Sequence, residues 1–144
     1  MADVHNGRCL RGAIEMQGLG EASVASCHCE MCQRWHGGPS LSANFADGIQ
    51  ITKGEGNVGW YKSSDWAERG FCKTCGSTLF YRLLDGGLIM GESGSFDLPT
   101  GLKMTEHYFV DEKPDYYDIT DDAPQLTGAE VFAKYAPDAE EAPQ

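Results

Sequence analysis

The chain has 144 residues, the length of one domain, and its 22 acidic against 11 basic side chains give a formal net charge of -11. This balance argues against nucleic acid as the main partner, because binding to phosphates draws on clustered Lys and Arg. No stretch approaches the ~18 apolar residues of a membrane span, and the N-terminus lacks the apolar run of a signal peptide. We therefore expect a soluble, cytoplasmic protein with no membrane partner.

The acidic surplus lies near the C-terminus. Residues 111–144 hold ten Asp or Glu against two Lys, and four prolines interrupt this stretch. We predict one domain over residues 5–120, followed by an acidic tail over residues 121–144. A solvated tail is the simplest interpretation, and within it only residues 128–135 favour a short helix.

Short stretches of alternating apolar and polar residues run through the body of the chain, separated by many of its 18 glycines. Because side chains alternate between the two faces of a strand and glycine favours turns, this pattern predicts a mainly β fold. In the first predicted strand Cys9 and Arg11 would share one face. The strands are expected at residues 8–17, 21–26, 40–45, 49–53, 58–62, 66–71, 77–84, 88–91 and 103–110, with a helical turn at 30–35.

Three cysteines lie within six residues: Cys27, Cys29 and Cys32, called the triplet below. The two-residue gap between Cys29 and Cys32 lets a tight turn direct both sulfurs at one metal ion. Three thiolates with no obvious fourth ligand describe a zinc site with an open position for water or a substrate atom. Thiols stay reduced in the cytoplasm, so metal binding is favoured over disulfides.

A second group begins with Cys72 and Cys75, followed by Gly76. This is the form of a zinc knuckle, in which glycine adopts positive φ and backbone N–H groups point at the thiolates. A knuckle supplies two ligands, and Cys9 is the only cysteine outside the two groups. We therefore predict a first zinc site at Cys9, Cys72 and Cys75, called the first cluster below, and a second zinc site at the triplet.

In their order, these motifs resemble the glutathione-dependent formaldehyde-activating family, which includes centromere protein V. The resemblance implies a β-tent of several small, coiled antiparallel sheets. It also implies a structural zinc held by an early cysteine pair and the knuckle, and a second zinc held by the triplet near the thiol site. The matching segments cover residues 7 to about 118 and are Gly7-Arg8-Cys9, Gly12-Ala13-Ile14, Cys27-His28-Cys29 with Cys32, Phe71-Cys72 with Cys75-Gly76, Gly94-Ser95-Phe96-Asp97 and His107-Tyr108-Phe109.

The chain departs from the family pattern at Arg11, which stands where the early pair has its second cysteine. Arginine stays protonated and cannot ligate zinc. Three outcomes are open: water or a histidine such as His5 or His107 completes the first site, the site is empty, or the metals are rearranged. Zinc, three thiolates and one nearby Arg sum to zero charge, which gives an electrostatic reason for the change to be tolerated.

Other polar residues are weighed against ordinary structural roles. His28 would point away from its neighbouring ligands on a strand, and His36 is better interpreted as a loop histidine than as a ligand or acid–base group. No Ser/His/Asp arrangement is visible in the sequence, and Asp121 and Asp122 are expected to be solvated. The candidates for holding the carboxylates of an anionic thiol such as glutathione are Arg34, Lys53, Arg69, Lys73 and Arg82.

Four aromatic residues could wall a pocket beside the triplet, although aromatics in a small β-rich domain are more often core. They are Trp35, Phe45, Trp60 and Trp66.

Two functions remain. An open zinc can lower the pKa of a bound thiol or polarise a carbonyl, and the resemblance implies a carbon–sulfur lyase that forms or breaks S-hydroxymethylglutathione from formaldehyde and glutathione. Because that adduct also forms spontaneously, enzyme status stays open. The alternative is a non-catalytic, zinc-stabilised module that binds glutathione, another thiol or a protein. The charge of -11 disfavours DNA binding by analogy with centromere protein V.

Overall fold

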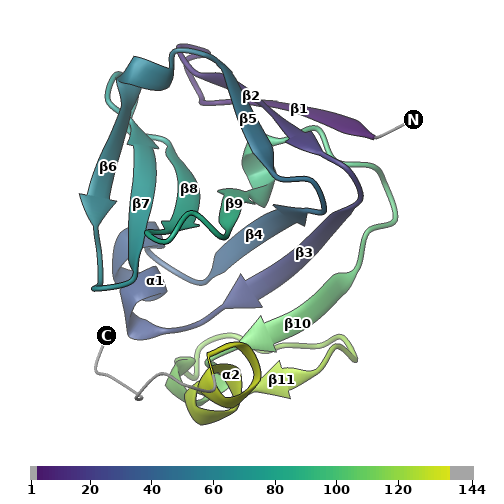
Figure 1. The fold of residues 1–144 in the computed structure, drawn as a ribbon. Coiled ribbons are helices and arrows are strands. Elements are labelled where there is room, and N and C mark those ends of the chain that lie inside the picture. Colours follow the sequence, from purple (N-terminus) through teal and green to yellow (C-terminus); the bar gives the residue numbers. More distant parts are fainter. Residues whose placement is uncertain (1–2, 137–144) are drawn as a thin grey trace. The chain divides into compact units, whose positions relative to one another are not determined.

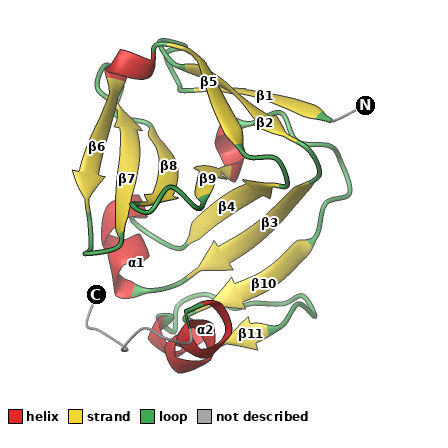
Figure 2. Ribbon diagram, viewed as in Figure 1, coloured by secondary structure: helices red, strands yellow, loops and turns green. Residues whose placement is uncertain are grey.

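A computed structural model of the chain describes residues 3–136, which fall into two compact units. Within this range, unit 1 comprises residues 3–23 and 42–102, and unit 2 comprises residues 24–41 and 103–136. The elements are drawn in Figures 1 and 2. Each cysteine cluster lies within one unit: the first cluster in unit 1 and the triplet in unit 2.

Unit 1 is built from antiparallel strands. One sheet has the order β1-β2-β5, and the other strands pair in the order β4-β9-β8-β7-β6. Short 3-10 turns at Glu55–Asn57 and Ser93–Ser95 connect strands. The strands are β1 (Val4–Arg8), β2 (Glu15–Leu19), β4 (Ser40–Phe45), β5 (Ile49–Lys53), β6 (Val58–Lys62), β7 (Ala67–Cys72), β8 (Thr78–Leu83) and β9 (Ile89–Glu92).

The core of unit 1 is formed by apolar side chains of its strands and of the turn before β2. Ile14, Met16, Leu79 and Phe80 are each at most 1% exposed. The Phe96 ring packs where two strands carry glycine, because a Cβ at Gly7 or Gly91 would overlap it. These glycines give the ring room to reach the backbone of β1 and β9.

The prediction of one strand over residues 8–17 is wrong. Residues 9–14 form a turn between β1 and β2, closed by the Gly12 N–H donating to the Cys9 carbonyl oxygen at 3.1 Å. Gly12 has φ 84°, a conformation that L side chains rarely adopt. Cys9 and Arg11 therefore do not share a strand face: Cys9 is buried and Arg11 is exposed.

Unit 2 contains β3 (Ala22–Cys27), which crosses the unit boundary, β10 (Met104–Tyr108), β11 (Gln125–Leu126), a 3-10 turn at Val110–Glu112, and the helices α1 (Glu30–His36) and α2 (Gly128–Tyr135). Strand β10 pairs with both β3 and β11, and both pairings are parallel. The expected antiparallel pairing thus holds for the pairings of unit 1, whereas both pairings of β10 in unit 2 are parallel. The mainly β class with several sheets is confirmed.

Both helices begin at a side-chain cap, and α1 also ends at a recognisable signal. The Cys29 sulfur accepts the Cys32 N–H at the start of α1, and Gly37, at φ 78°, ends that helix. Thr127 caps α2 in a capping box with Glu130. The helix predicted at residues 128–135 is therefore present, while residues 137–144 of the predicted tail lie outside the described residues.

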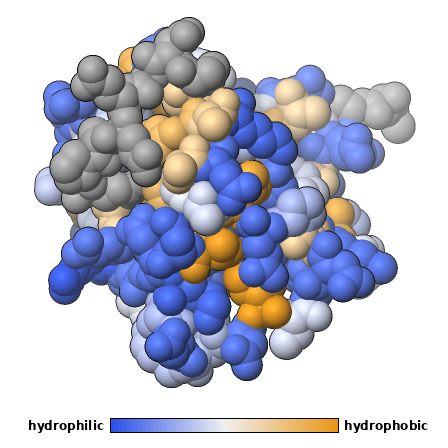
Figure 3. Space-filling view, turned by 90° about the horizontal axis from the view of Figure 1, so that it is seen from below, coloured by the Kyte–Doolittle hydropathy of each residue, from blue (hydrophilic) through white to orange (hydrophobic). Residues whose placement is uncertain are grey.

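Neither helix of the described chain is long and apolar enough to cross a membrane. The face drawn in Figure 3 is mostly hydrophilic, with hydrophobic side chains gathered into small patches.

The close packing of Phe96 on Gly91 lets us predict how one added methyl group at residue 91 changes stability. Gly91→Ala is expected to lower the free energy of unfolding by about 1–3 kcal/mol, because the ring must shift to admit the new Cβ. Urea denaturation measures the loss. Gly94→Ala is the matched control, since a Cβ there meets no atom within 4 Å. Equal losses in the two variants would contradict the role assigned to Phe96.

Candidate functional site

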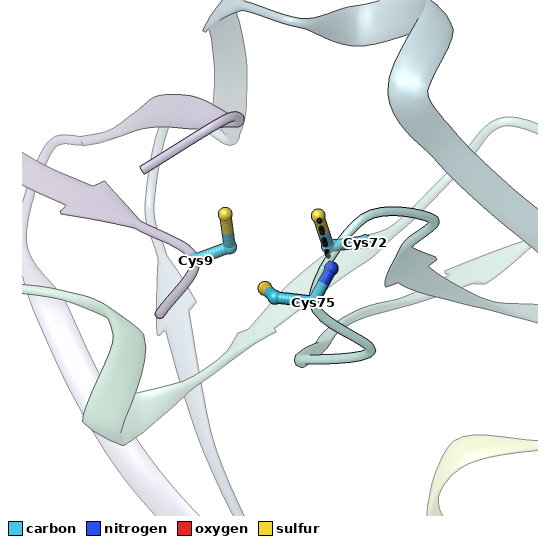
Figure 4. Close-up of side chains that lie close together, drawn as sticks. All are labelled: Cys9, Cys72 and Cys75. Carbon is cyan, nitrogen blue, oxygen red and sulfur yellow. Dashed lines mark hydrogen bonds between the residues drawn. The ribbon is translucent and has the colours of Figure 1, made fainter. Parts of the chain in front are cut away.

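The first cluster brings together three sulfurs that are distant in sequence. Cys9 lies in the turn after β1, Cys72 ends β7, and Cys75 lies in the turn before β8. Their side chains lie close together (Figure 4), and the sulfur atoms lie within 4.8 Å of one another. The predicted grouping of these cysteines is therefore present in the structure.

Amide groups surround the sulfurs of the first cluster. The Cys75 N–H donates to the Cys72 sulfur at 3.5 Å, the bond drawn in Figure 4, and the Ile14 N–H donates to the Cys9 sulfur at 3.4 Å. The Asn57 side-chain amide also donates to the Cys72 sulfur, at 3.4 Å. Such donors stabilise thiolates, as expected of a zinc knuckle.

Cys75 is the half-buried member of this cluster. The Leu10 N–H donates to the Ser77 hydroxyl oxygen at 3.0 Å, and the same hydroxyl group forms a hydrogen bond with the Cys75 sulfur at 3.1 Å. Hydrogen bonds from this hydroxyl, and then from the Arg11 and Ser77 backbone N–H groups, lower the pKa of the Cys75 thiol to about 6. Gly76, at φ 78°, makes the tight turn that the sequence predicted.

The triplet is assembled where β3 leads into α1. Cys27 ends β3, Cys29 caps α1, and Cys32 lies in the first turn of the helix. Their sulfurs also lie within 4.8 Å of one another. The Cys32 N–H donates to the Cys29 sulfur at 3.3 Å, so the helix start itself holds two of the three sulfurs in place.

The thiols of Cys27 and Cys29 in the triplet lose their protons less readily than the thiol of Cys75. Hydrogen bonds with Cys29 and Cys32, together with burial, raise the pKa of Cys27 well above its usual value. The pKa of Cys29 is raised to about 11: its hydrogen bond with Cys27 lowers it, but the hydrogen bond with Cys32 and burial raise it more. Three mutually repelling thiolates in a buried site call for a cation that offsets their charge.

Helix α2 supplies the apolar surroundings of the triplet. Val131 and Phe132 pack against the buried cluster that contains Cys29, Cys32 and Phe109. The Phe109 and Phe132 rings meet edge to face at 5.9 Å. Sequence reasoning placed the helix but did not connect it with the triplet, because nothing in the spacing of residues 128–135 indicates its partner.

A buried polar network lies on the other side of β3. The Ser26 hydroxyl lies 2.8 Å from His28 Nε2 and 2.5 Å from His107 Nδ1. His107 Nε2 lies 2.9 Å from Asp121, and His28 Nδ1 lies 2.7 Å from the Tyr117 hydroxyl. The structure thus contains a Ser/His/Asp arrangement that was not visible in the sequence.

This network has a structural role. Ser26 is only 2% exposed, which keeps its hydroxyl from acting as a nucleophile on a dissolved substrate. The network fixes the residues on either side of Cys27, so it positions the strand that carries the triplet. The expectation that His28 turns away from the ligands is confirmed, whereas Asp121 is bonded to His107 rather than merely solvated.

The predicted anion-binding cations make specific contacts within the protein, and the three arginines show this most clearly. Arg69 is buried and its guanidinium faces the Tyr81 ring. Arg82 pairs with Glu68 at 2.6 Å and covers the Trp60 ring. Arg34 forms an exposed pair with Glu30 at 3.5 Å. These contacts give structural reasons for all three, and substrate binding by any of the five cations stays a prediction.

The predicted aromatic wall is not gathered in one unit. Phe45 packs against Phe96 in unit 1, with ring centroids 4.8 Å apart, and Trp60 stacks on Phe80 there. Trp66, also in unit 1, is 36% exposed. Trp35 lies on α1, in the unit of the triplet.

Both clusters have the chemistry of a zinc site. Each offers three sulfur ligands at short mutual distances, and thiolates suit zinc better than magnesium or calcium. Over residues 3–136, neither cluster includes a fourth His, Cys, Asp or Glu ligand atom. His36 belongs to neither cluster.

Comparisons with known proteins identify a family and similar proteins for this chain. The sequence model of a family described as glutathione-dependent formaldehyde-activating enzyme matches residues 4–112. An uncharacterized lyase of Schizosaccharomyces pombe is 32% identical over 130 residues, covering 89% of this chain and 94% of the lyase. A crystal structure of a Rhodobacter sphaeroides protein is similar with a TM-score of 0.50 and 20% identity, covering 83% of this chain and 98% of the other; this likeness concerns the fold alone.

From the two clusters we predict the number of zinc ions that each chain binds. Protein saturated with zinc and freed of excess metal is expected to hold two equivalents per chain, one per cluster. Cys72→Ser and Cys29→Ser should each reduce this to one equivalent, and the double variant should hold none. Elemental analysis by mass spectrometry measures the content. An unchanged content in Cys72→Ser would rule out a zinc ion in the first cluster.

From the contacts of the Glu106 carboxylate we predict that the stability of α2 depends on pH. It accepts hydrogen bonds from Tyr108 at 3.1 Å, from Lys134 at 2.5 Å and from Tyr135. Burial raises the pKa of Glu106, but these hydrogen bonds outweigh it and hold the pKa below its usual 4.5. Because the folded pKa lies below the unfolded one, the stabilisation is full above about pH 4.5 and is lost as the pH falls.

Glu106→Gln is therefore expected to cost about 1–3 kcal/mol at pH 7, and this cost should shrink progressively as the pH falls below 4.5 and through the lowered pKa of the folded state. Hydrogen exchange of the α2 amides measures the effect, with exposed Glu55→Gln as the control. A cost that stays constant as the pH falls from 7 to well below 4.5 would contradict the role of the ionised carboxylate.

Proposed function

The chain belongs to the glutathione-dependent formaldehyde-activating enzyme family, and from this membership we propose that it is a zinc-dependent carbon–sulfur lyase of thiol adducts. The observation that carries the proposal is the triplet: three sulfurs converge within 4.8 Å, and the cluster includes no fourth ligand atom over the described residues. A zinc site with three protein ligands keeps a position for a reacting atom.

The proposed substrate is S-hydroxymethylglutathione or a related adduct of a small thiol. In its formation the thiol sulfur bonds to the carbon of formaldehyde, and the thiol proton passes to the carbonyl oxygen. In its breakdown both changes are reversed. Zinc bound at the triplet would supply Lewis-acid stabilisation of the thiolate or polarisation of the carbonyl.

The chain's own residues prepare this site in three ways. Cys27, Cys29 and Cys32 hold the metal, and the Cys29 sulfur is fixed by the start of α1. The Ser26 network fixes β3 on the opposite side from the sulfurs. Val131 and Phe132 make the surroundings apolar, which strengthens electrostatic interactions at the triplet.

One observation favours the second candidate, a non-catalytic thiol- or protein-binding module. Cys29 and Cys32 are 3% and 6% exposed and form the buried core of unit 2 with Phe109. In a core this small, zinc would contribute folding free energy directly. In this alternative the triplet maintains the fold, and glutathione binds without turnover.

The reducing cytoplasm is the proposed compartment, because all six cysteines are free thiols in the structure and metal binding requires them reduced.

Exchange between free and hydroxymethylated glutathione, followed by NMR, tests the proposed activity. Zinc-loaded protein is expected to accelerate exchange above the uncatalysed rate. Cys27→Ala should remove most of this acceleration, by about 100-fold if the metal supplies ~3 kcal/mol. Cys27 is chosen because it is the least buried of the triplet.

Cys75→Ala is the control, because it removes one thiol from the first cluster instead. Circular dichroism verifies that both variants fold. No acceleration by the wild-type protein would refute the lyase proposal. Glutathione binding without acceleration would favour the module, as would unfolding of Cys27→Ala.

A further inference from the structure

The first cluster differs from a closed zinc site because it lacks a fourth protein ligand over the described residues. Cys9, Cys72 and Cys75 converge, but over residues 3–136 no other His, Cys, Asp or Glu joins them. His5 lies outside the cluster: its Nε2 lies 3.1 Å from the Gly20 carbonyl oxygen and its ring packs on Phe45. His107 uses both ring nitrogens in the Ser26 network. Neither histidine completes the site.

The side of the first cluster on which a fourth ligand could bind lies beside Arg11. This residue sits in the Cys9–Gly12 turn, and its backbone N–H donates to the Cys75 sulfur, so its Cα lies at the cluster. Its side chain is exposed, and so is its neighbour Leu10, at 81%. Cys9 and Cys72 are buried beneath, whereas Cys75 is half-buried. The side of the cluster near residue 11 therefore faces solvent.

Each of the three sulfurs is held by hydrogen bonds from the surrounding chain. Backbone N–H groups of Ile14 and Cys75 and the Asn57 amide point at two of them, and the Ser77 hydroxyl bonds to the third. These donors come from three separate segments of the chain. Such an arrangement is costly to assemble unless the sulfurs work as thiolates.

Three cations lie in the chain segments that carry these cysteines: Arg8, Arg11 and Lys73. The Arg8 guanidinium donates to the Cys9 and Leu10 carbonyl oxygens at 3.1 and 2.9 Å, and Lys73 donates to the Gly56 carbonyl oxygen at 3.4 Å. Arg11 adds a third positive charge at the solvent side. Zinc with three thiolates carries a charge of about -1, so these cations favour one more anionic ligand.

We propose that Cys9, Cys72 and Cys75 form a second open zinc site, whose fourth position beside Arg11 takes an external anionic thiol. This site is independent of the triplet and of the proposed lyase activity. Arg11 has two roles in it. It leaves the fourth position free because a guanidinium cannot ligate zinc, and its charge favours thiols that carry a carboxylate.

Cobalt(II) substitution tests the proposal, because the visible absorption of cobalt reports the number of sulfur ligands. Fully cobalt-loaded wild type and Arg11→Cys are each titrated with mercaptoacetate. The two proteins share the triplet, so the difference between their titrations isolates the first cluster. A thiol-induced spectral change is expected there in the wild type and not in Arg11→Cys, in which the introduced thiol supplies the fourth sulfur.

The introduced thiol should also slow extraction of cobalt from this cluster by a chelator, by about tenfold or more. Identical thiol titrations of wild type and Arg11→Cys would overturn the proposal. So would wild-type cobalt spectra that show four sulfur ligands at the first cluster before thiol is added.

The Arg11→Ala variant tests whether the charge of the guanidinium favours thiols that carry a carboxylate. It keeps the fourth position open, so the spectral change should persist. Its affinity for mercaptoacetate should fall about two- to fivefold relative to that for uncharged 2-mercaptoethanol, as expected for an exposed ion pair. Arg11→Lys should restore the preference. Equal preferences in wild type and Arg11→Ala would overturn the role of the guanidinium.

Discussion

Repulsion between crowded thiolates is the constraint on which both units depend. In each cluster three sulfurs lie within 4.8 Å of one another. Two unit charges about 4 Å apart repel by about 4 kcal/mol at an effective dielectric constant of 20. A chain that folds into this arrangement must either keep its thiols protonated or bind a cation. A zinc ion bound in either cluster would remove the repulsion and tie the segments together through the same bonds, which would link metal binding to folding.

The two clusters meet this constraint differently. In the first cluster, hydrogen bonds from the Ser77 hydroxyl and from the Arg11 and Ser77 backbone N–H groups lower the pKa of Cys75 to about 6. In the triplet, burial and mutual hydrogen bonds raise the pKa of Cys27 and Cys29. Thiolates are therefore partly stabilised by the protein in unit 1, whereas in unit 2 they depend more on the metal. The same ligand type serves two different electrostatic settings.

Local patterns were sufficient to predict much of the fold. The strands at 40–45, 49–53 and 58–62 and the helix at 128–135 have the predicted bounds, because alternation, glycine turns and capping residues are local signals. The first strand was overextended because the apolar residues on both sides of Gly12 fit one alternating pattern, although Gly12 itself, at φ 84°, marks the turn. The cysteine clusters were predictable from spacing and from counting the thiols available.

Long-range pairing could not be predicted in this way. Ser26 and His107 are 81 residues apart, and they meet because β3 and β10 pair in parallel, with His107 opposite Ser26. No local pattern specifies that register. Asp121 joins the network from a stretch whose composition indicated only solvated chain. The polar support of the triplet is therefore a property of the folded unit.

The surroundings of the triplet also extend beyond the part of the chain that the family shares. The family match ends at residue 112, whereas α2 begins at Gly128. Phe109, inside the match, adopts φ 57°, which costs about 1–2 kcal/mol for an L residue. Its ring packs against Phe132 and lies where a Cβ at residue 128 would be, so the strained residue and the later helix fit each other. The shared region thus supplies the ligands, and the segment that follows it supplies the apolar surface around them. A difference in that segment between relatives would change what reaches the triplet without altering any ligand.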